Sequence, residues 1–266
     1  MNQQYSVADT DDTVVQFSLV QLDDYGPWTV TPEPRPEPSL QALQARLYAD
    51  LADFVGSRDG YVFPGRYDNM IAVTNSIAPD EHRRFQELVR NRYPITASVG
   101  VGTGATPDDA LGAATEALQA TGSAQDASRT ERLATDRDAD PAGPLTVAHF
   151  DVVDATGRYT DQEHALDAER RIRRAVVELT DRMAEHGAVT SFVGGDNAIA
   201  VCPDLDDETY DDVLAGVRDA AGVELRVGVG RGETAQAAGQ GAKHALETGR
   251  ATGDWVVTAA PASTDD

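Results

Sequence analysis

Four aspartates of this chain fall into two pairs with the same internal spacing. Asp23 and Asp68 are 45 residues apart, Asp151 and Asp196 are also 45 residues apart, and 128 residues separate one pair from the other. The first member of each pair follows an apolar, β-rich run, and the second lies at a predicted turn. Carboxylate oxygens are the hard ligands that Mg²⁺ and Mn²⁺ prefer. The sequence therefore predicts a divalent-cation site from each pair.

A single aspartate at a turn or strand end has an ordinary structural explanation, because its side chain bonds to nearby backbone groups. Two pairs with one spacing favour the metal-site interpretation instead. Two ions held by such a pair would bridge a triphosphate, neutralise its charge, activate a water and stabilise a leaving oxygen. This chemistry suits a nucleotide substrate.

The two predicted turns differ in the residues before the aspartate. Gly194 and Gly195 precede the second-half aspartate, whereas Arg66 and a tyrosine precede the first. Glycines leave room for a ligand to approach the backbone, although a tight turn that needs glycine angles is the alternative. We therefore favour Asp151 and Asp196 as the catalytic pair. The first-half pair would then serve substrate recognition, with the reversed roles left open.

Matched residues at the 128-residue offset extend through most of each half, which indicates internal duplication of a small domain. Val99–Gly102 matches Val227–Gly230, and Asp68–Val73 matches Asp196–Val201. The expected organisation is a disordered acidic tail at 1–12, one unit at 13–121, a linker at 122–144, a second unit at 145–260 and a tail at 261–266.

Each half shows the order strand, helix, strand, strand, helix, strand, followed by an extra helix. This order predicts an α+β fold of two tandem ferredoxin-like domains, each an antiparallel sheet with helices on one face. In the first half we expect strands at 14–22, 60–64, 69–74 and 95–102, and helices beginning at Ser39, at 80–91 and at 107–120. In the second half we expect strands at 145–150, 188–193, 197–202, 223–230 and 254–258, and helices at 162–186, 207–221 and 234–248.

Composition excludes several classes of function. The chain has 45 acidic and 22 basic residues and a formal charge of −23. Such a surface disfavours nucleic acid and is typical of proteins adapted to high salt. Cys202 is the only cysteine, which excludes an intramolecular disulfide and a thiolate zinc cluster. No apolar run approaches the length of a membrane span, and the start does not resemble a signal peptide, so we expect a cytoplasmic protein.

Other residues are weaker candidates for substrate contacts. Tyr25 and Trp28 could stack on a base or simply pack together. The loop after Asp151 could offer backbone N–H groups and Thr156 and Gly157 to phosphate. Asp161, like Asp154, could contact a metal or a guanine edge, or be an ordinary loop acid. Four arginines could pair with phosphate, and the sequence does not rank them: Arg35, Arg66, Arg92 and Arg129. The two Val-Gly-Val-Gly runs lack the lysine of a P-loop and are better explained by close strand–helix packing.

Several longer stretches resemble the archaeal GTP cyclohydrolase III family. These stretches are QLDDYGPWTVTP (21–32), LQALQARLYADL (40–51), RYDN (66–69), NRYP (91–94), GSAQD with a following Arg129 (122–129), TGRYTD (156–161) and GGDN (194–197). The RYDN and GGDN stretches add Asn69 and Asn197 to the candidate substrate contacts. The resemblance leads us to expect asparagine directly after the strand-ending acid, but this chain has Asp24 there. The role of the Asp24 side chain stays open.

The resemblance implies a duplicated palm domain, the fold of polymerase cores, nucleotidyl cyclases and GGDEF proteins. It implies hydrolytic opening of the guanine imidazole ring of GTP with release of phosphate. The implied product is a formylamino-pyrimidinone ribonucleotide monophosphate for flavin and deazaflavin synthesis. It also implies Mg²⁺ at the aspartates, a monovalent cation such as K⁺, and a homo-oligomer.

Two rival functions remain open from the sequence. A palm-type nucleotidyl or dinucleotide cyclase would use the same metals, with a ribose hydroxyl as nucleophile in place of water. A catalytically silent GTP-binding sensor would bind the nucleotide without turnover. Loss of the purine absorbance band on incubation with GTP would separate ring opening from both.

Overall fold

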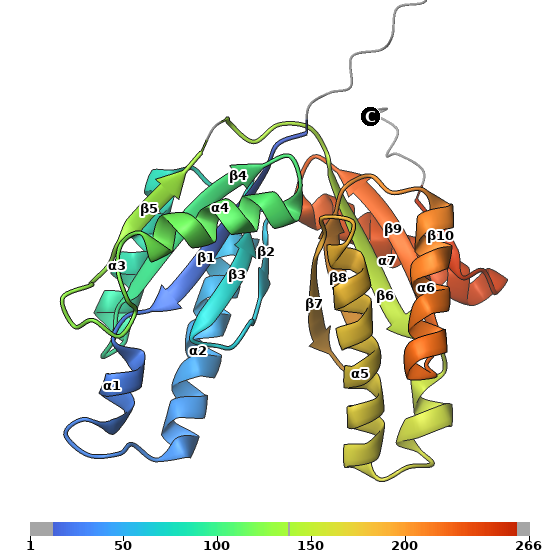
Figure 1. Ribbon diagram of the computed structural model, residues 1–266, viewed down its shortest axis with the longest axis horizontal. Coiled ribbons are helices and arrows are strands. Elements are labelled where there is room, and N and C mark those ends of the chain that lie inside the picture. Colours follow the sequence, from blue (N-terminus) through green and yellow to red (C-terminus); the bar gives the residue numbers. More distant parts are fainter. Residues whose placement is uncertain (1–12, 138, 260–266) are drawn as a thin grey trace, which may run out of the picture.

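The computed structural model describes residues 13–137 and 139–259 as an α+β chain with two five-stranded sheets (Figure 1). The expected tails at 1–12 and 261–266 lie outside the described residues. No helix within the described residues combines the length and apolar character that crossing a bilayer requires.

The first half contains one sheet and four α-helices. In chain order it comprises β1 (Val15–Leu22), α1 (Tyr25–Val30), α2 (Glu37–Gly56), β2 (Tyr61–Phe63), β3 (Asn69–Val73), a 3₁₀ turn (Pro79–Glu81), α3 (His82–Arg92), β4 (Ala97–Gly104), α4 (Pro107–Gln119) and β5 (Leu133–Asp136). The strand order across the sheet is β2-β3-β1-β4-β5. Strand β1 is antiparallel to both neighbours, and β5 is parallel to β4.

The second half repeats this plan. It comprises β6 (Leu145–Val152), a π-helical turn (Thr156–Thr160), α5 (Ala165–Ala184), β7 (Val189–Gly194), β8 (Asn197–Cys202), α6 (Asp207–Ala221), β9 (Leu225–Gly232), α7 (Ala235–Thr252) and β10 (Val256–Thr258). The strand order is β7-β8-β6-β9-β10, with β10 parallel to β9. The two units therefore have the same topology, as the duplication predicts.

Three local expectations are wrong. Helix α2 begins at Glu37 rather than after Ser39. Pro36 is its N-cap residue, and the Ser39 amide donates to the Pro36 carbonyl. Pro38 is accommodated because the amides of the first helical turn have no partner within the helix. The expected proline-rich loop contains α1, a six-residue helix. The expected linker contains β5, which adds to the β4 edge through pairing of Val99 with Leu133.

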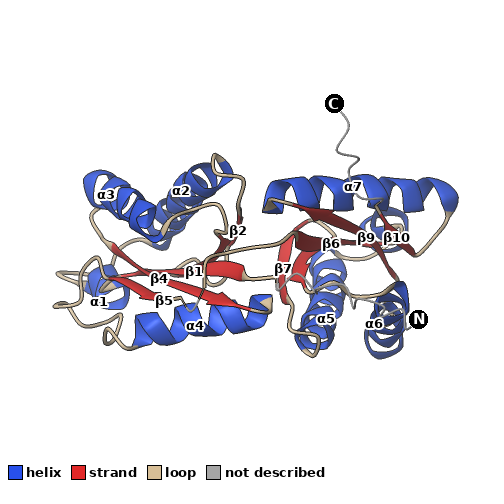
Figure 2. Cartoon of the chain, turned by 90° about the horizontal axis from the view of Figure 1, so that it is seen from above, coloured by secondary structure: helices blue, strands red, loops and turns tan. Residues whose placement is uncertain are grey.

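Each sheet is covered on both faces (Figure 2). The two connecting helices of a unit share one face, as expected, and pack on Val99 and Val101 in the first half. The extra helix covers the other face. A Cβ atom at Gly100 or Gly102 would overlap the backbone of α4. The Val-Gly-Val-Gly runs thus permit close strand–helix packing, with valines directed to one core and glycines to the opposite helix.

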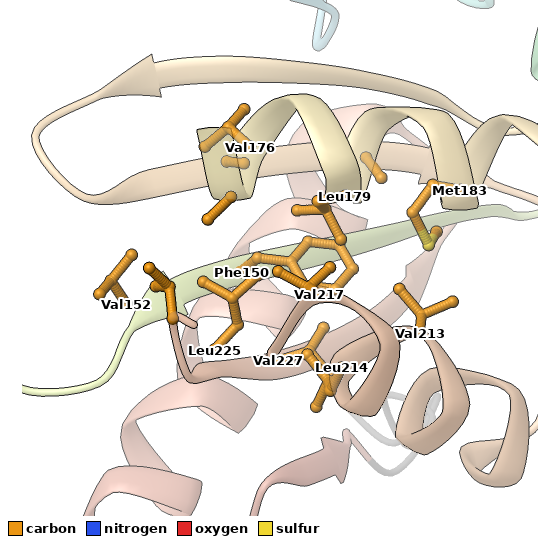
Figure 3. Close-up of a cluster of buried hydrophobic side chains, with 14 of the residues drawn as sticks. Phe150, Val152, Val176, Leu179, Met183, Val213, Leu214, Val217, Leu225 and Val227 are labelled. Carbon is orange, nitrogen blue, oxygen red and sulfur yellow. The ribbon is translucent and has the colours of Figure 1, made fainter. Parts of the chain in front are cut away.

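A hydrophobic core fills the space between the second sheet and helices α5 and α6 (Figure 3). Its members come from β6, α5, α6 and β9, and Phe150, Leu179 and Val217 are fully buried. Burying each such side chain stabilises the fold by roughly 1.5–3 kcal/mol relative to exposure. An equivalent core lies under α2 and α3 in the first half.

The two halves join through a third buried cluster and through reciprocal hydrogen bonds. Phe17 and Val147 belong to this shared cluster. At the start of α4, the Asp108 amide donates to the carbonyl of Gly187 at 3.1 Å, and at the start of α7 the Gln236 amide donates to that of Asp59 at 3.2 Å. Because each contact is the 128-residue counterpart of the other, the halves meet as in an isologous dimer.

Candidate active site

The second-half aspartates lie side by side where β6 ends against the β7–β8 turn. Asp151 is the register partner of Asn197, and the next amide, of Val152, donates to the Asp196 carbonyl at 3.1 Å. The strand pairing thus places both carboxylates at one end of the sheet. The negative charge of Asp196 also acts on Asp151. The metal role of this pair stays a prediction.

Asp151 is almost fully buried beside an arginine. Its exposed fraction is 5%, and the Arg250 guanidinium at the end of α7 lies 2.6 Å from its Oδ1. Arg250 therefore forms an ion pair with Oδ1, which accepts no hydrogen bond of good geometry among the described residues. Burial raises the pKa of Asp151, Arg250 opposes that change, and the negative charge of Asp196 adds to it. A cation placed here would gain a ligand whose lone pairs are not satisfied.

A second group of side chains orients the hairpin acid. Asn197 donates from Nδ2 to Asp196 Oδ1 at 2.7 Å, and its own Oδ1 accepts from His149 Nε2 at 3.0 Å. An amide oxygen only accepts, so this bond assigns the Nε2 proton to His149. Burial lowers the pKa of His149, which keeps the ring neutral near pH 7. The chain from His149 through Asn197 therefore holds Asp196 in place.

The residues of this centre fit a magnesium ion in part. Mg²⁺ is commonly bound by one or two carboxylates, with water and substrate phosphate completing its octahedron. Asp151 and Asp196 supply two carboxylates, and a cation would compete with Arg250 for the Oδ1 atom of Asp151. No cluster of three or more potential ligands occurs within residues 13–137 and 139–259. An ion here would therefore take its other ligands from water or from a bound nucleotide.

The first half is arranged differently, because its first strand is displaced by two residues. Phe17 pairs with Val73 and Gln21 with Asn69, whereas in the second half Val147 pairs with Val201 and Asp151 with Asn197. Pairing with the other neighbouring strand shows the same displacement. Gln21, and not Asp23, is thus the structural counterpart of Asp151. The assumption of a single 128-residue offset throughout is wrong for this strand.

The displacement has a local cause. Asp24 and Asp154, which share a left-handed backbone with φ near 50°, mark the same point after the first strand of each half. The first half then uses two more residues to reach its long helix, α2, than the second half uses to reach α5. Those residues belong to the proline-rich segment around α1. The extra length shifts β1 relative to the rest of its unit.

Asp23 forms a buried ion pair, and its oxygens are already satisfied. Oδ1 accepts from Ser98 Oγ at 2.6 Å and from Arg129 Nη2 at 3.1 Å, and Oδ2 accepts from Thr96 Oγ1 and from the Glu131 amide, both at 2.9 Å. The side chains of Asp23 and Arg129 are 2% and 3% exposed. A cation could bind Asp23 only by displacing these donors. Its predicted metal role stays a prediction that this arrangement does not favour.

Asp68 and Asp23 have different ion-pair partners among the described residues. The Asp68 carboxylate faces Arg66 at 3.7 Å, with that arginine largely exposed, and its buried Oδ1 lacks a partner among the described residues. Asn69 accepts from Gln21 Nε2 at 2.8 Å. The first-half turn thus has an amide where the second half has the Asp151 carboxylate.

The predicted aromatic contacts form a packed group. Tyr25 and Trp28 stack with ring centroids 6.0 Å apart, and the Arg35 guanidinium covers the Trp28 ring at 3.9 Å. Trp28 also lines a cleft of about 290 Å³ beside Asp23 and Asp24. A base could stack on Trp28 there only by displacing one of these two neighbours. Arg92, one of the arginines predicted to pair with phosphate, forms an ion pair with Asp50 at 2.7 Å.

The predicted phosphate loop is partly engaged by its own residues. The Gly157 amide donates to Asp154 Oδ1 at 3.2 Å, and the Asp161 amide donates to the Thr156 carbonyl at 3.0 Å. These groups lie in the π-helical turn after Asp151. Their role as phosphate ligands stays a prediction.

The glycine turn supports both explanations given for it. Gly194 and Gly195 have φ of 111° and 62°, angles that favour glycine, and a Cβ at Gly194 would meet open space. The first-half counterpart of Gly195 is Tyr67, which adopts φ 65° despite its side chain. Glycine is therefore not the only residue that the turn accepts, and in the second half it also leaves the approach to Asp196 open.

Two residues of this centre escaped the sequence analysis. Arg250 lies 99 residues beyond Asp151 and belongs to no motif, so only packing of α7 on the sheet brings it there. His149 belongs to none of the predicted motifs, and the five histidines of the chain lie far apart without ligand spacing. Its position two residues before Asp151 on a strand, where alternate residues share a face, was the available signal.

The fold and the site together define an α+β protein of two similar units, in which strand pairing brings Asp151 and Asp196 to one end of the second sheet. A family model described as GTP cyclohydrolase III matches residues 15–260. The chain belongs to the GTP cyclohydrolase III family.

Curated relatives cover nearly the whole chain. It is 58% identical over 241 residues to "GTP cyclohydrolase III 2" of Halobacterium salinarum, covering 89% of this chain and 95% of the relative. It is 53% identical over 256 residues to GTP cyclohydrolase III of Halorubrum lacusprofundi, covering 95% and 100%. Among solved structures it is similar to the GGEEF domain of a diguanylate cyclase from Vibrio cholerae, with 14% identity and a TM-score of 0.37 over 45% of this chain and 85% of that domain.

Proposed function

We propose that this chain is a GTP cyclohydrolase that opens the guanine imidazole ring with water and releases phosphate from the triphosphate. Family membership supports GTP as the substrate. The observation that carries the mechanism is the second-half centre, where Asp151 presents a buried oxygen without a hydrogen-bond partner beside Asp196. Mg²⁺, with K⁺ as a supporting cation, is the cofactor that this centre would hold. A cytoplasmic homo-oligomer remains our expectation.

The chemistry consists of two kinds of hydrolysis. In ring opening, one water adds to C8 of the guanine, the bond from C8 to N9 breaks, and the carbon remains on N7 as a formyl group. In phosphate release, water attacks phosphorus and the bridging oxygen leaves with the remaining nucleotide. Bound divalent ions would lower the pKa of such a water and neutralise the phosphate oxygens.

The residues of the chain supply position and charge. Asp151 and Asp196 would hold the cations, and Asn197 with His149 would keep Asp196 oriented. Arg250, whose side chain is 40% exposed, is able to turn from Asp151 toward an incoming phosphate. Open space beside Gly194 would admit the nucleotide. The first-half cleft beside Asp24 and Trp28 is our candidate for substrate recognition.

The proposal is tested by incubating the chain with GTP and Mg²⁺ in KCl and following the purine absorbance. Loss of that band with release of phosphate is the expected result. A product that keeps the purine band, with a cyclic phosphodiester, would establish the cyclase alternative. Tight GTP binding without any turnover would establish the sensor alternative.

A further inference from the structure

Two grooves lie at equivalent positions in the two halves, on the helix face of each sheet. One, of about 450 Å³, lies where the first turns of α5 approach the end of α6, and its charged lining is Glu163, Asp167, Arg170, Arg171 and Arg174. The other, of about 430 Å³, lies between α2 and α3 and contains Arg46, Asp50 and Arg92. Arg46 and Arg174 occupy the same place in the duplicated fold, 128 residues apart.

Arg174 makes no ion pair with any other residue in the described part of the chain. The acid one helical turn later, Glu178, accepts instead from Arg182 Nε at 2.8 Å. Within the groove, Arg170 pairs with Asp167 at 2.5 Å and Arg171 pairs with Glu163 at 2.9 Å. The groove therefore carries three guanidinium groups against two carboxylates, and the surplus positive charge belongs to Arg174.

The first-half groove repeats this pattern with fewer charges. The acid one turn after Arg46 is Asp50, and it is engaged by Arg92 at 2.7 Å and by Tyr93 Oη at 2.6 Å. Arg46 likewise makes no ion pair within the described residues. With Arg92 held by Asp50, only one guanidinium is available there.

The arrangement on α5 leaves the positive charge of the exposed Arg174 without a carboxylate partner among the described residues. Arg170 and Arg174 are four residues apart and Arg171 and Arg174 three apart, so the like charges are neighbours on one helix face and repel. The chain has 45 acidic residues against 22 basic ones, so an arginine without an acidic partner is notable in this chain. Guanidinium groups bind phosphate oxygens in paired, charge-assisted hydrogen bonds.

We propose that the groove between α5 and α6 is a binding site for a phosphate-bearing small anion, held mainly by Arg174 with Arg170 and Arg171. It is separate from the carboxylate centre, because Asp151 faces Arg250 of α7 on the other side of the sheet (Figure 2). The site goes beyond the proposed catalytic function. The α2–α3 groove is its weaker counterpart.

The test is a calorimetric titration of pyrophosphate into the full chain, in EDTA and at a fixed KCl concentration at which circular dichroism shows the chain folded. EDTA removes divalent ions, so phosphate cannot be retained at the carboxylate centre through a metal. We expect one site per chain. R174A should weaken binding at least about tenfold, since it removes the unpaired charge, and R174K should retain part of the affinity.

Two matched controls exist in the chain. Arg173 is adjacent in sequence but pairs with Glu169 and lies over the Phe192 ring, so R173A should leave binding unchanged. R46A removes the equivalent arginine of the other half and should also leave the site intact. Equal affinity of R174A and the parent chain, or equal loss in R173A, would overturn the proposal. If R174A also melts at a lower temperature, R174K, which keeps the positive charge, separates the loss of affinity from a loss of stability.

Further titrations with inorganic phosphate and with GTP identify the source of the phosphoryl group. Weaker binding of phosphate than of pyrophosphate, with R174A affecting both, supports recognition of the anion itself. Binding of GTP that depends on Arg174 while neither inorganic anion binds would support the site and identify a nucleotide as its ligand, whereas no binding of any of the three would overturn the proposal. Turnover of GTP does not enter these measurements, so failure here leaves the proposed function untouched.

Discussion

The two halves of this chain share a topology but differ at the one place where chemistry is expected. In the second half, Asp151 and Asp196 meet where the first strand ends against the hairpin. In the first half, the slide of β1 by two residues puts Gln21 in the place of Asp151 and carries Asp23 beyond the hairpin to Arg129. A two-residue displacement keeps every side chain on its original face, so the core survives while the site is lost. Duplication has thus left one carboxylate pair and one carboxylate–amide pair.

The acids of the two halves also differ in what surrounds them. Asp23 has donors on both oxygens and a buried arginine, which makes it an element of stability. Asp151 has a half-exposed arginine and an oxygen without a hydrogen bond, which makes it open to a cation. The Asp23–Arg129 pair is buried on both sides and fully hydrogen-bonded, which suits a structural role. In the Asp151–Arg250 pair the arginine is partly exposed, which leaves the acid able to exchange its partner.

Replacing Asp151 or Asp196 by asparagine is expected to have the largest effect. Either change removes a cation ligand, and the loss of several kcal/mol of charge stabilisation predicts a fall in GTP turnover of about 100-fold or more. Initial rates of phosphate release, with melting temperatures as control, measure this. Asp68→Asn should cost much less. Equal loss from Asp68→Asn and Asp151→Asn would mean that both halves contribute catalytic metal ligands.

Removing Arg129 should destabilise the fold strongly, whereas removing Arg250 should not. Arg129→Ala leaves the Asp23 carboxylate buried without its partner, which predicts a loss of about 3–5 kcal/mol in the free energy of unfolding. Arg250→Ala should cost less than Arg129→Ala, because Arg250 is 40% exposed, although the buried Asp151 carboxylate loses its ion-pair partner. Denaturant titrations of both variants give the comparison. Similar losses in the two would show that the pairs are equally structural.

Gln21→Asp would restore in the first half the carboxylate that the displacement removed. The new acid would lie opposite Asn69, beside Asp68, as Asp151 lies opposite Asn197. We expect one more Mn²⁺ site than in the parent chain, with an affinity within about tenfold of that of the proposed second-half site, counted by electron paramagnetic resonance titration. Gln44→Asp on α2 is the control, because it adds the same charge outside the β1–β3 pairing. An unchanged count of Mn²⁺ would mean that strand position alone does not create the site.

The smallest effect concerns a buried histidine present in one half only. His82 Nδ1 donates to the carbonyls of Ala78 and Pro79 and Nε2 accepts from Ser18 Oγ, while its second-half counterpart is Tyr210. Burial lowers the pKa of His82 below its ordinary value of about 6.5. Between the folded and unfolded pKa the unfolded chain binds more protons, so stability should fall as the pH drops below about 6.5.

His82→Gln should therefore flatten the dependence of unfolding free energy on pH below about 6.5. A residual slope is expected because burial also lowers the pKa of His149. Denaturant titrations at several pH values measure the two slopes. Identical slopes in the parent and the variant would show that His82 does not contribute.

Much of the fold follows from local patterns in the chain. The Val-Gly-Val-Gly runs predict strands with one helix-packed face, and the observed packing of α4 and α7 on those glycines confirms it. Helix α1 and strand β5 were missed for a different reason. Helix α1 is six residues long and contains Gly26 and Pro27, and its Trp28 lies beneath the Arg35 guanidinium. Strand β5 is a polar segment that becomes a strand only by pairing with the edge of β4.

The candidate site was predictable in position but not in detail. Asp151 and Asp196 were identified from spacing, and strand pairing brings them together. The equal spacing of Asp23 and Asp68 was misleading, because two extra residues in the proline-rich segment move β1 along its neighbours. Spacing along the chain cannot reveal such a slide, since register depends on contacts between strands.

The sequence alone determined that one small α+β unit is present twice, because hydrophobic periodicity, turn residues and repeated motifs are properties of neighbouring residues. It also determined that the chain carries a large negative charge and too few cysteines for an intramolecular disulfide or a thiolate zinc cluster. Tertiary structure alone decided which partners surround each buried acid. Arg129 and Arg250 reach Asp23 and Asp151 from segments about 100 residues away, and only the packing of distant segments sets the burial and hydrogen bonding of a carboxylate.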